Sequence, residues 1–362
     1  MRPLPLRWWW LALALVLASR PSPAPLIYKP GEGWTYESVG GGRWQRTRAK
    51  DQFEVAEEAF EAGNYGLALK AARRVVKVWP LSDYAPRAQF LAGRAEEARG
   101  DLRRAFRAYD TLIQQFPKTA DYDESLERQK AIGDSFLDGK WFKLWGWLPW
   151  FPTTEKAIEM YNAVVLAGPY SDVAPPAQMK IGEAHEKRRD YLLAVRAYER
   201  AADRYSDQKD VVSDAFYRAG LAWRKQAREA DYDQSAAGRA IAAFSDFITL
   251  FPDDPRVPEV QGYIVDLYRT QAEGNYRIAR YYEKRRRDDG AVIYYSAVAD
   301  IYTRQIKEPD APRAVEARQR IADIRGRQAQ ETEVQRAADL APTGPVPASE
   351  PEPAALPDPA TR

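Results

Sequence analysis

The sequence predicts an all-α protein in which about six helical hairpins stack into a solenoid and a final helix caps the array. At six places in the 362 residues, an alanine is paired with the residue four positions later, which is usually a large aromatic. A glycine precedes four of these pairs, and a proline follows four of them. The alanines recur at steps of 37, 52, 37, 46 and 51 residues. Such internal repetition is typical of repeat proteins.

Each pair places a small and a large side chain on one face of a helix. The alanine lets a neighbouring helix approach, and the aromatic ring fills the space beside it. The pairs are Ala105/Tyr109, Ala157/Tyr161, Ala194/Tyr198, Ala240/Phe244, Ala291/Tyr295 and, as a weak copy, Ala68/Ala72. The glycines that mark the closest approach on the first helix are Gly93, Gly133, Gly182 and Gly220. One hairpin cannot bury its apolar face alone, so neighbouring hairpins must stack.

Prolines indicate where the second helices end, because proline lacks an N–H group and disfavours helix at the residue before it. They are Pro80, Pro117, Pro169 and Pro252, with Ser206 and Thr303 at the equivalent positions of the other two units. Strand signals are scarce, and no alternating segment lies convincingly between hairpin turns. Stretches rich in alanine, glutamate, arginine and leucine favour helix along most of the chain.

The N-terminus has the form of a secretory signal. Arg2 and Arg7 precede an apolar run of eleven residues, Trp8–Ala18. The run is too short to span a membrane comfortably. We expect residues 1–18 to be cleaved before Ser19, with an uncleaved anchor as the alternative. Residues 19–48, rich in proline, glycine and aromatic residues, are expected to form an extended leader.

The repeat domain is expected to span residues 49–338. Hairpins are predicted at about 49–80 and 84–117, with turns at residues 63–64 and 100–101. The third hairpin is interrupted by residues 137–152, the fourth turns at 189–190, and the fifth carries an insertion around 230–238. The sixth has a long first helix, 257–284, a turn at 288–290 and a second helix to about residue 306. A polar helix from 312 to 338 caps the array, and the proline-rich tail, 339–362, is expected to be disordered.

The insertion at 137–152 is the one locally unusual segment, because it holds four of the chain's eleven tryptophans within ten residues. Its candidate contact residues for a partner or a membrane are Trp141, Phe142, Trp145, Trp147 and Trp150. Two interpretations stay open. The loop packs between hairpins as additional core, or it is an exposed apolar loop that docks a partner or enters a membrane interface, where tryptophan is favoured.

A second candidate contact is the densest basic run, Lys284, Arg285 and Arg286, which Arg287 extends. It lies where the long first helix of the sixth hairpin approaches its turn. Cations near a helix C-terminus are stabilised by the helix dipole, which is one explanation for this run. Contact with an acidic partner surface is the other.

Composition argues against several functional classes. The absence of cysteine excludes disulfides, thiolate metal sites and cysteine nucleophiles. The one histidine, His185, is expected on a helix surface and not as a catalytic base. No HExxH, GxSxG or phosphate-loop pattern occurs, so we expect no enzyme, cofactor or metal site. Loss of Arg2 and Arg7 with the signal lowers the 54 basic residues to 52, equal to the 52 acidic residues. This balance gives no support to nucleic-acid binding.

The hairpins resemble tetratricopeptide repeats over about residues 49–325, with a small residue and glycine on the first helix, alanine then aromatic on the second, and proline at the end. Two stretches are similar more narrowly to the BamD-type outer-membrane assembly factors. They are GNYGLALKAARRVVKVWPLSDYAPRAQFLAG at 63–93 and GNYRIARYYEKRRRDDGAVIYYSAVADIY at 274–302. In the second stretch, a long helix ends in Ala-Arg-Tyr-Tyr-x-Lys before the final alanine–aromatic helix.

The resemblance implies a non-enzymatic periplasmic scaffold, peripheral to the outer membrane, in the machinery that assembles β-barrel proteins. Its partners would be the periplasmic domains of the barrel insertase, held by the C-terminal repeats, and nascent β-barrel clients, held in a groove of the N-terminal repeats. Family members usually carry a lipidated cysteine after the signal, and this chain has none. We therefore expect it not to be a lipoprotein and to attach through an uncleaved N-terminus, the tryptophan-rich insertion or a partner.

Two other functions remain open. A soluble periplasmic repeat protein that coordinates cell-wall synthesis or division would share the fold and differ in its partners. A helical cell-wall enzyme of the lytic-transglycosylase kind would need a catalytic glutamate in a cleft, and no acidic residue is marked by its surroundings. The mechanism we expect is binding by shape, in which tyrosine and arginine side chains on the inner helices contact an extended peptide or a folded partner.

Overall fold

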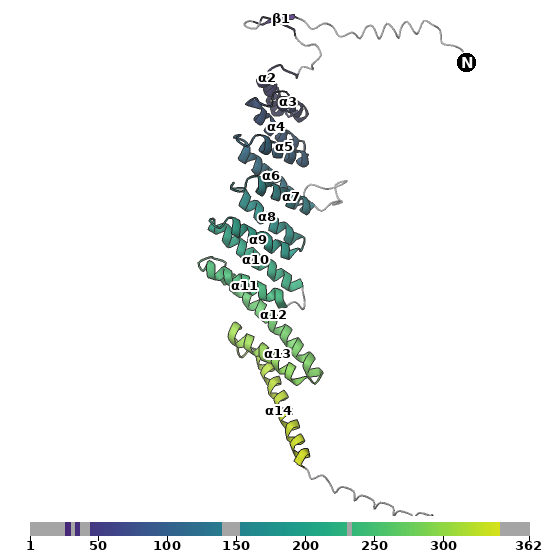
Figure 1. The fold of residues 1–362 in the computed structure, drawn as a ribbon, viewed down its shortest axis with the longest axis vertical. Coiled ribbons are helices and arrows are strands. Elements are labelled where there is room, and N and C mark those ends of the chain that lie inside the picture. The colour runs from purple at the N-terminus through teal and green to yellow at the C-terminus, as the bar shows by residue number, and fades with distance from the viewer. Residues whose placement is uncertain (1–25, 30–32, 37–43, 140–152, 230–233, 341–362) are drawn as a thin grey trace, which may run out of the picture. The chain divides into compact units, whose positions relative to one another are not determined.

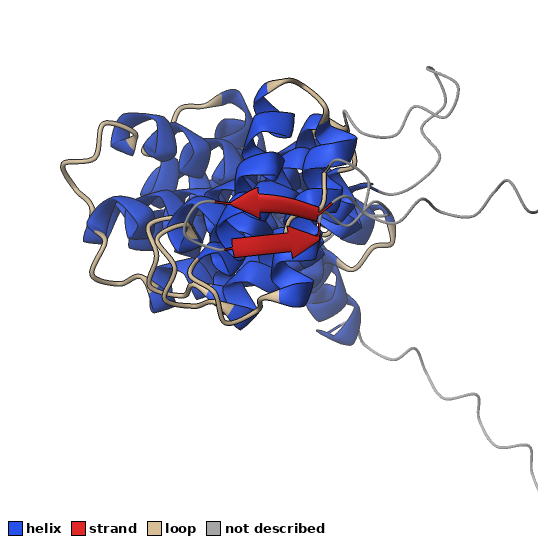
Figure 2. Cartoon of the chain, turned by 90° about the horizontal axis from the view of Figure 1, so that it is seen from above, coloured by secondary structure: helices blue, strands red, loops and turns tan. Residues whose placement is uncertain are grey.

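The computed structural model describes residues 26–29, 33–36, 44–139, 153–229 and 234–340. Almost all of these residues lie in α-helices joined by short turns, so the all-α prediction is confirmed (Figures 1 and 2). The chain forms two compact units, residues 1–215 and residues 216–362. The boundary between them falls within helix α10 (Lys209–Glu229).

The first unit is a series of helical hairpins in which each helix packs against the next along the chain. The second helix of one hairpin also packs against the first helix of the following hairpin. Its helices before α10 are α2 (Ala49–Glu61), α3 (Tyr65–Val78), α4 (Tyr84–Ala98), α5 (Leu102–Gln115), α6 (Tyr122–Leu137), α7 (Thr153–Ala167), α8 (Ala174–Lys187) and α9 (Tyr191–Arg204). Even-numbered helices are therefore the first helices of hairpins, and odd-numbered helices are the second.

The second unit continues the same plan with longer helices. It comprises the end of α10, then α11 (Gln234–Leu250), α12 (Val257–Lys284), α13 (Asp288–Asp300) and α14 (Pro312–Leu340). A π-helical turn, Ile301–Ile306, extends α13 and ends at Lys307, whose φ of 62° is left-handed. Helix α13 packs against both α12 and α14. The buried side chains of Tyr276, Tyr295 and Ile324 join these three helices into one core.

Two short strands lie in the region expected to form an extended leader, although strand signals in the sequence are scarce. Strands β1 (Leu26–Lys29) and β2 (Gly33–Tyr36) pair antiparallel, with Leu26 opposite Tyr36 and Lys29 opposite Gly33. The sequence carried the signal, because both runs contain β-branched or aromatic residues and the residues between them are Pro30, Gly31 and Glu32. Proline and glycine between two such runs are typical of a hairpin connection.

Turns inside the hairpins depend on residues that can leave the helix sharply. Gly63 and Gly100 adopt left-handed φ angles of 74° and 80° after α2 and α4, a conformation that glycine reaches without a steric cost. The next helices then start with side-chain caps. The Asn64 side chain accepts a hydrogen bond from the Leu67 N–H, and the Asp101 side chain accepts one from the Arg104 N–H. Such caps satisfy N–H groups that a helix start leaves free.

Close contact between a first helix and an aromatic ring sets the spacing within several hairpins. A Cβ atom added at Gly93 would lie 2.4 Å from Cε1 of Tyr109, and one at Gly182 would lie 2.3 Å from Cε1 of Tyr198. These are far inside van der Waals contact, so only glycine fits. The rings themselves are fully buried. Gly133 and Gly220 meet Tyr161 and Phe244 in the same way.

Two predicted boundaries are wrong. In the fifth hairpin, α11 already begins at Gln234, and the small residues Ala236 and Ala237 are buried on it, so the insertion does not reach residue 238. In the sixth, residues 288–290 form the first turn of α13, where acidic Asp288 and Asp289 suit the helix dipole. Residues 285–287 make the turn instead, with Arg286 at a φ of 56°.

Within the residues that the structure describes, no helix is both long and apolar enough to cross a membrane. Helix α14 is long but strongly polar, and its last twelve residues, 329–340, are all exposed. Residues 1–18, most of the tryptophan-rich insertion and the proline-rich tail from residue 341 lie outside the described residues.

Candidate protein-interaction surface

The repeated tyrosine does more than fill space, because its hydroxyl donates a hydrogen bond to a carboxylate on the first helix of the same hairpin. The bonds are Tyr109–Glu97 at 2.5 Å, Tyr161–Asp134 at 2.7 Å, Tyr198–Glu186 at 2.6 Å and Tyr295–Glu283 at 2.8 Å. Burial, and then the bond to a carboxylate, raise the pKa of Tyr109, Tyr161 and Tyr295 well above the usual value for tyrosine. Each hydroxyl therefore stays protonated and fastens the two helices together.

The fifth hairpin lacks this bond and has a compensating change. Phe244 replaces tyrosine and has no hydroxyl, and Arg224 stands four residues after Gly220, where Glu97 stands after Gly93. The Arg224 guanidinium instead lies 3.9 Å from the centre of the Tyr263 ring of α12. An arginine over an aromatic face is a favourable cation–π contact. The residue four positions after the glycine thus contacts the next hairpin here, because its own hairpin has phenylalanine in place of tyrosine and so no hydroxyl to bind.

An amide side chain four residues before the glycine supplies a second recurring bond. The Gln89 side-chain amide donates to the carbonyl oxygen of Ala108 at 2.8 Å, and Gln178 donates to that of Ala197 at 3.0 Å. In α2, Gln52 is fully buried and binds the leader instead. It accepts from the Arg46 N–H at 2.8 Å and donates to the Trp44 carbonyl oxygen at 3.0 Å.

The sequence contained a signal for these bonds that the alanine–aromatic pattern did not use. The first helices of two hairpins read Gln-x-x-x-Gly-x-x-x-Glu, as Gln89-Gly93-Glu97 and Gln178-Gly182-Glu186. The sixth reads Asn275-Ala279-Glu283. Residues four apart share one helix face, so these three positions form a stripe that faces the second helix. The repeated aromatic positions named in the sequence, from Tyr109 to Tyr295, lie against this stripe.

Arginine side chains stacked on aromatic rings connect successive first helices in the first unit. The guanidinium carbon of Arg87 lies 4.7 Å from the ring centre of Phe53, and that of Arg94 lies 4.8 Å from Phe60. One hairpin later, Arg128 lies 5.6 Å from Phe90. We call these six residues of α2, α4 and α6 the arginine–aromatic surface.

Carboxylates hold two of the three arginines of this surface in place. Arg87 pairs with Glu57 at 3.2 Å, and Arg128 pairs with Glu97 at 3.1 Å and with Glu124 at 2.8 Å. The Arg87 side chain is still 55% exposed and that of Arg128 31%. The result is a row of accessible guanidinium groups with fixed orientation above aromatic rings. Such a row can bind carboxylates, backbone carbonyls and aromatic side chains of another protein.

The second unit has similar contacts between its first helices and α14. Arg313 of α14 lies 4.2 Å from the ring centre of Tyr276 and pairs with Glu273 at 3.0 Å. The Tyr217 hydroxyl donates to Glu259 at 3.4 Å, and the Tyr263 hydroxyl donates to the same carboxylate. The bond to Glu259, and then burial, raise the pKa of Tyr263 to about 12. These groups organise the helices and offer no acid–base pair in a cleft.

The predicted contact residues fall in two classes. Trp141, Phe142, Trp145, Trp147 and Trp150 lie outside the described residues, so both interpretations of the insertion remain predictions. Lys284, Arg285 and Arg286 are all exposed at the end of α12 and in the turn that follows. The lone histidine, His185, is half-buried on α8, where burial lowers its pKa.

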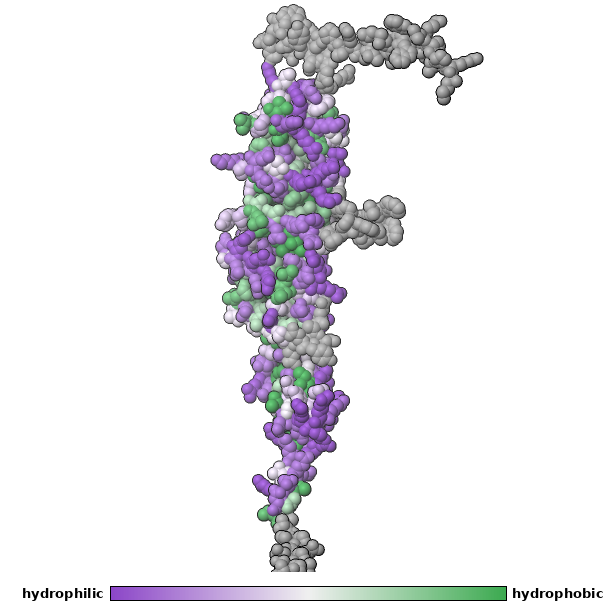
Figure 3. Space-filling model, turned by 45° about the vertical axis from the view of Figure 1, so that its right-hand side comes forward, coloured by the Kyte–Doolittle hydropathy of each residue, from purple (hydrophilic) through white to green (hydrophobic). Residues whose placement is uncertain are grey.

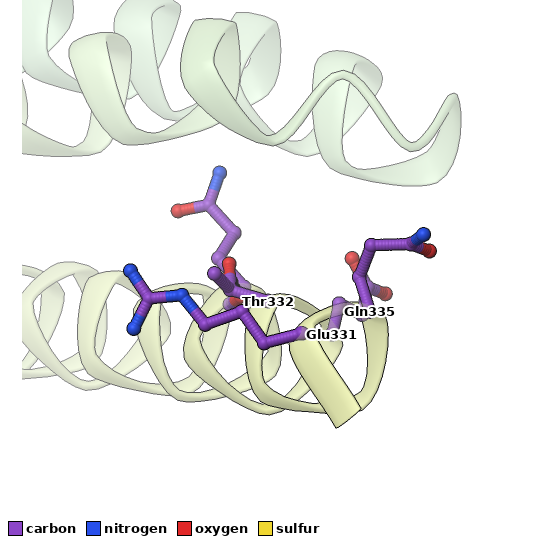
Figure 4. Close-up of a pocket in the computed structure, with 5 residues that line it drawn as sticks. Glu331, Thr332 and Gln335 are labelled. Carbon is purple, nitrogen blue, oxygen red and sulfur yellow. Dashed lines mark hydrogen bonds between the residues drawn. The ribbon is translucent and has the colours of Figure 1, made fainter. Parts of the chain in front are cut away.

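Hollows in the described part of the chain are open and are lined by both polar and apolar surface. One of them follows the exposed end of α14, where Glu331, Thr332 and Gln335 project from the helix surface (Figure 4). Among the described residues, no cluster of histidine or acidic side chains could hold a metal ion. Figure 3 shows mainly hydrophilic side chains on the visible face, with small apolar areas between them. Extended surface is therefore the main feature available for binding.

Comparison with known proteins decides the family. A profile of the outer-membrane lipoproteins described as YfiO matches residues 152–336, just over half of the chain. The chain belongs to this family. A tetratricopeptide-repeat profile matches residues 87–119, which cover most of α4 and all of α5. The resemblance to BamD-type repeat proteins is thereby confirmed.

A curated relative agrees with this assignment. The chain is 23% identical over 160 residues to a protein of Helicobacter pylori (strain ATCC 700392 / 26695) named outer membrane protein assembly factor BamD. The aligned region covers 43% of this chain and 71% of the relative.

Solved structures with some similarity are also repeat proteins. One is a tetratricopeptide repeat protein from Parabacteroides merdae, with a TM-score of 0.32, 11% identity and coverage of 74% of this chain and 98% of that chain. Another is the C-terminal part of a repeat protein from Cytophaga hutchinsonii, with a TM-score of 0.35, 15% identity and coverage of 75% and 88%. Both are too distant to bear on single residues or on function.

Proposed function

We propose that this protein is a non-enzymatic scaffold that acts in the assembly of outer-membrane β-barrel proteins. The observation that carries the proposal is the family match over residues 152–336, together with a relative named as an outer membrane protein assembly factor. The fold supports a scaffold, because stacked hairpins present long surfaces to which other proteins can bind. In the second unit, the matched region includes α11, α12, α13 and most of α14.

We place the protein in the periplasm, peripheral to the outer membrane, after export through residues 1–18. Its partners would be the periplasmic domains of a barrel insertase and nascent barrel chains. In the first unit, the arginine–aromatic surface is the contact that the geometry favours. It combines one exposed and two half-buried arginines with half-buried or buried aromatic rings, and these residue types are enriched where proteins bind one another.

Site-specific crosslinking tests both the partner and the surface. A photoreactive residue replaces Arg94 on α4, and the control carries it at Arg107 on the exposed side of α5. The crosslinked proteins are purified from cell envelopes and identified by mass spectrometry. We expect barrel-insertase subunits from the Arg94 position and far fewer from Arg107. Equal recovery from the two positions would contradict the arginine–aromatic surface while leaving the assembly role intact.

The same experiment tests the second candidate function. A coordinator of cell-wall synthesis or division would yield peptidoglycan synthases or division proteins in place of the insertase. The repeat fold favours that function as much as the first, because the fold specifies protein binding and not the partner. Recovery of cell-wall proteins alone, without any insertase subunit, would overturn the assembly proposal.

A further inference from the structure

The end of the α12–α13 hairpin concentrates positive charge. Residues 277–287 contain six cations, all of them exposed: Arg277, Arg280, Lys284, Arg285, Arg286 and Arg287. We call this set the basic tip. Arg277, Arg280 and Lys284 are three and four residues apart and so share one face of α12. The other three form the turn, in which the left-handed conformation of Arg286 redirects the chain.

The neighbouring carboxylates are engaged on the other side of the hairpin. Glu283 accepts a hydrogen bond from the Tyr295 hydroxyl at 2.8 Å and lies 3.8 Å from Arg320 of α14. Asp288 lies 3.5 Å from Arg327, also of α14. Asp289 accepts a bond from the Gln328 amide at 3.1 Å. The printed contacts of these three acidic groups are therefore made to α13 and α14, and among the described residues none of the three forms a salt bridge with a cation of the basic tip.

The helix dipole does not explain the whole tip. A dipole stabilises cations only within the last turn of a helix, which covers Lys284 at the end of α12. Arg277 lies about two turns earlier, so its position gains nothing from the dipole. Nor do ion pairs explain the set, because the structure shows no salt bridge of Lys284, Arg286 or Arg287 to any residue that it describes.

Exposed apolar side chains accompany the charges. Tyr281 is 53% exposed on the same face as Arg277 and Lys284, and the Arg285 guanidinium lies 4.8 Å from its ring centre. Ile293 of α13 is 66% exposed on the same hairpin. Tyrosine is favoured at the boundary between water and lipid, and arginine binds phosphate through two parallel hydrogen bonds.

We propose that the basic tip is a peripheral binding site for an anionic phospholipid surface. Clusters of four to eight lysine and arginine residues are typical of such contacts. A lipid surface fits better than a single acidic protein, because a layer of phosphates can meet cations from both a helix face and a turn at once. The inference goes beyond the proposed scaffold function, which concerns protein partners.

Vesicle sedimentation with the full chain tests the site. The probes are vesicles of phosphatidylcholine with phosphatidylglycerol and vesicles of phosphatidylcholine alone. We expect binding to the first only, weakened by salt. The test variant carries Lys284→Gln, Arg285→Gln, Arg286→Gln and Arg287→Gln. Each cation near an anionic surface changes partition about fivefold, so we expect a loss of about a hundredfold or more.

A matched control removes four other exposed cations with Lys70→Gln, Arg107→Gln, Lys118→Gln and Lys209→Gln. It should bind within about fivefold of the wild type, which separates a site from general charge. Tyr281→Ser keeps every charge and should weaken binding by a smaller factor. Thermal unfolding of each variant shows that the helices are intact.

Three outcomes would overturn the proposal. The first is equal loss in the test variant and the control. The second is equal binding of the wild type to both kinds of vesicle. The third is binding to soluble glycerophosphate or to polyglutamate with no binding to vesicles, which would identify a free-phosphate site or an acidic-protein contact instead. None of these outcomes depends on the insertase, so failure here is distinguishable from failure of the scaffold function.

Discussion

Replacing Gly182 by alanine tests whether the ring-to-helix contact sets the hairpin spacing. The added Cβ would lie 2.3 Å, 2.5 Å and 2.7 Å from three atoms of the Tyr198 ring. The ring is fully buried and its hydroxyl is held by Glu186, so it cannot move without breaking other contacts. Overpacking of this kind costs up to about 3 kcal/mol. Alanine is also a better helix former than glycine by about 1 kcal/mol. The expected net loss is therefore about 2 kcal/mol.

Gly262→Ala in α12 is the matched control, because no atom lies within 4 Å of its added Cβ. There the helix preference acts alone and should raise stability by about 0.5–1 kcal/mol. Gly66→Ala in α3 is a second control in the same unit as Gly182, where a Cβ meets only Asn64 Oδ1 at 3.9 Å. The same helix preference should leave its stability equal to or slightly above that of the wild type. Gly182→Ala should lower the free energy of unfolding and Gly262→Ala should raise it, so the sign of each change, and not its exact size, tests the reasoning.

Urea unfolding followed by circular dichroism measures these changes. Repeat arrays need not unfold in one step, so the transition of each unit is analysed separately. A double-mutant cycle adds Tyr198→Leu, which removes the ring atoms nearest to Gly182. In that background, Gly182→Ala should cost clearly less. Stability equal to or above the wild type for Gly182→Ala alone would refute the reasoning.

Three further predictions concern the recurring bonds. Tyr198→Phe should cost about 1 kcal/mol by chemical unfolding, because the hydrogen bond from Tyr198 to Glu186 is lost, whereas Phe244→Tyr should bring no gain, since Arg224 stands where the acceptor would be. The pKa of Tyr109 is raised in the folded state, so this tyrosine stays protonated there at a pH at which it ionises in the unfolded chain. Its contribution to the free energy of unfolding is complete below the unfolded pKa and is lost at higher pH. Stability should therefore fall above about pH 10 by roughly 1.4 kcal/mol per pH unit for each such tyrosine. A flat alkaline profile in urea titrations would contradict this. Gln52→Leu should release the leader, because two hydrogen bonds hold residues 44–46, and limited proteolysis near Trp44 should become faster while the α4–α5 region stays protected.

Much of the fold followed from the residues themselves. The predicted long helix, 257–284, coincides with α12 (Val257–Lys284). Local signals favoured a helix there, because Pro258 stands in the first turn and no further proline follows before the basic run, although Gly274-Asn275 is the same pair that forms the turn at Gly63-Asn64. Sequence reasoning placed the sixth turn wrongly because Asp-Asp-Gly suits a turn and a helix start alike. The tertiary contact decided between them, since Gly290 packs against the Tyr282 ring, 2.9 Å from an added Cβ.

The candidate surface divides in the same way. The alanine–aromatic pairs could be read from the sequence, because both members lie on one helix and a fixed spacing places them together. The arginine–aromatic surface could not. Arg87 and Phe53 lie on different hairpins, and their contact depends on how one first helix crosses the next.

What the sequence by itself determined is the repeat, its helices and its family likeness, since these depend on periodicities within a few turns of helix. Only the tertiary structure decided which charged groups form hydrogen bonds and ion pairs within the protein and which stay exposed and available for binding. Glu97 accepts hydrogen bonds from both Tyr109 and Arg128, and Glu283 accepts one from Tyr295. Arg286, in an equally charged stretch, is left exposed. The reason is physical: a charge is neutralised by its neighbours in space, and those neighbours come from helices distant in the chain.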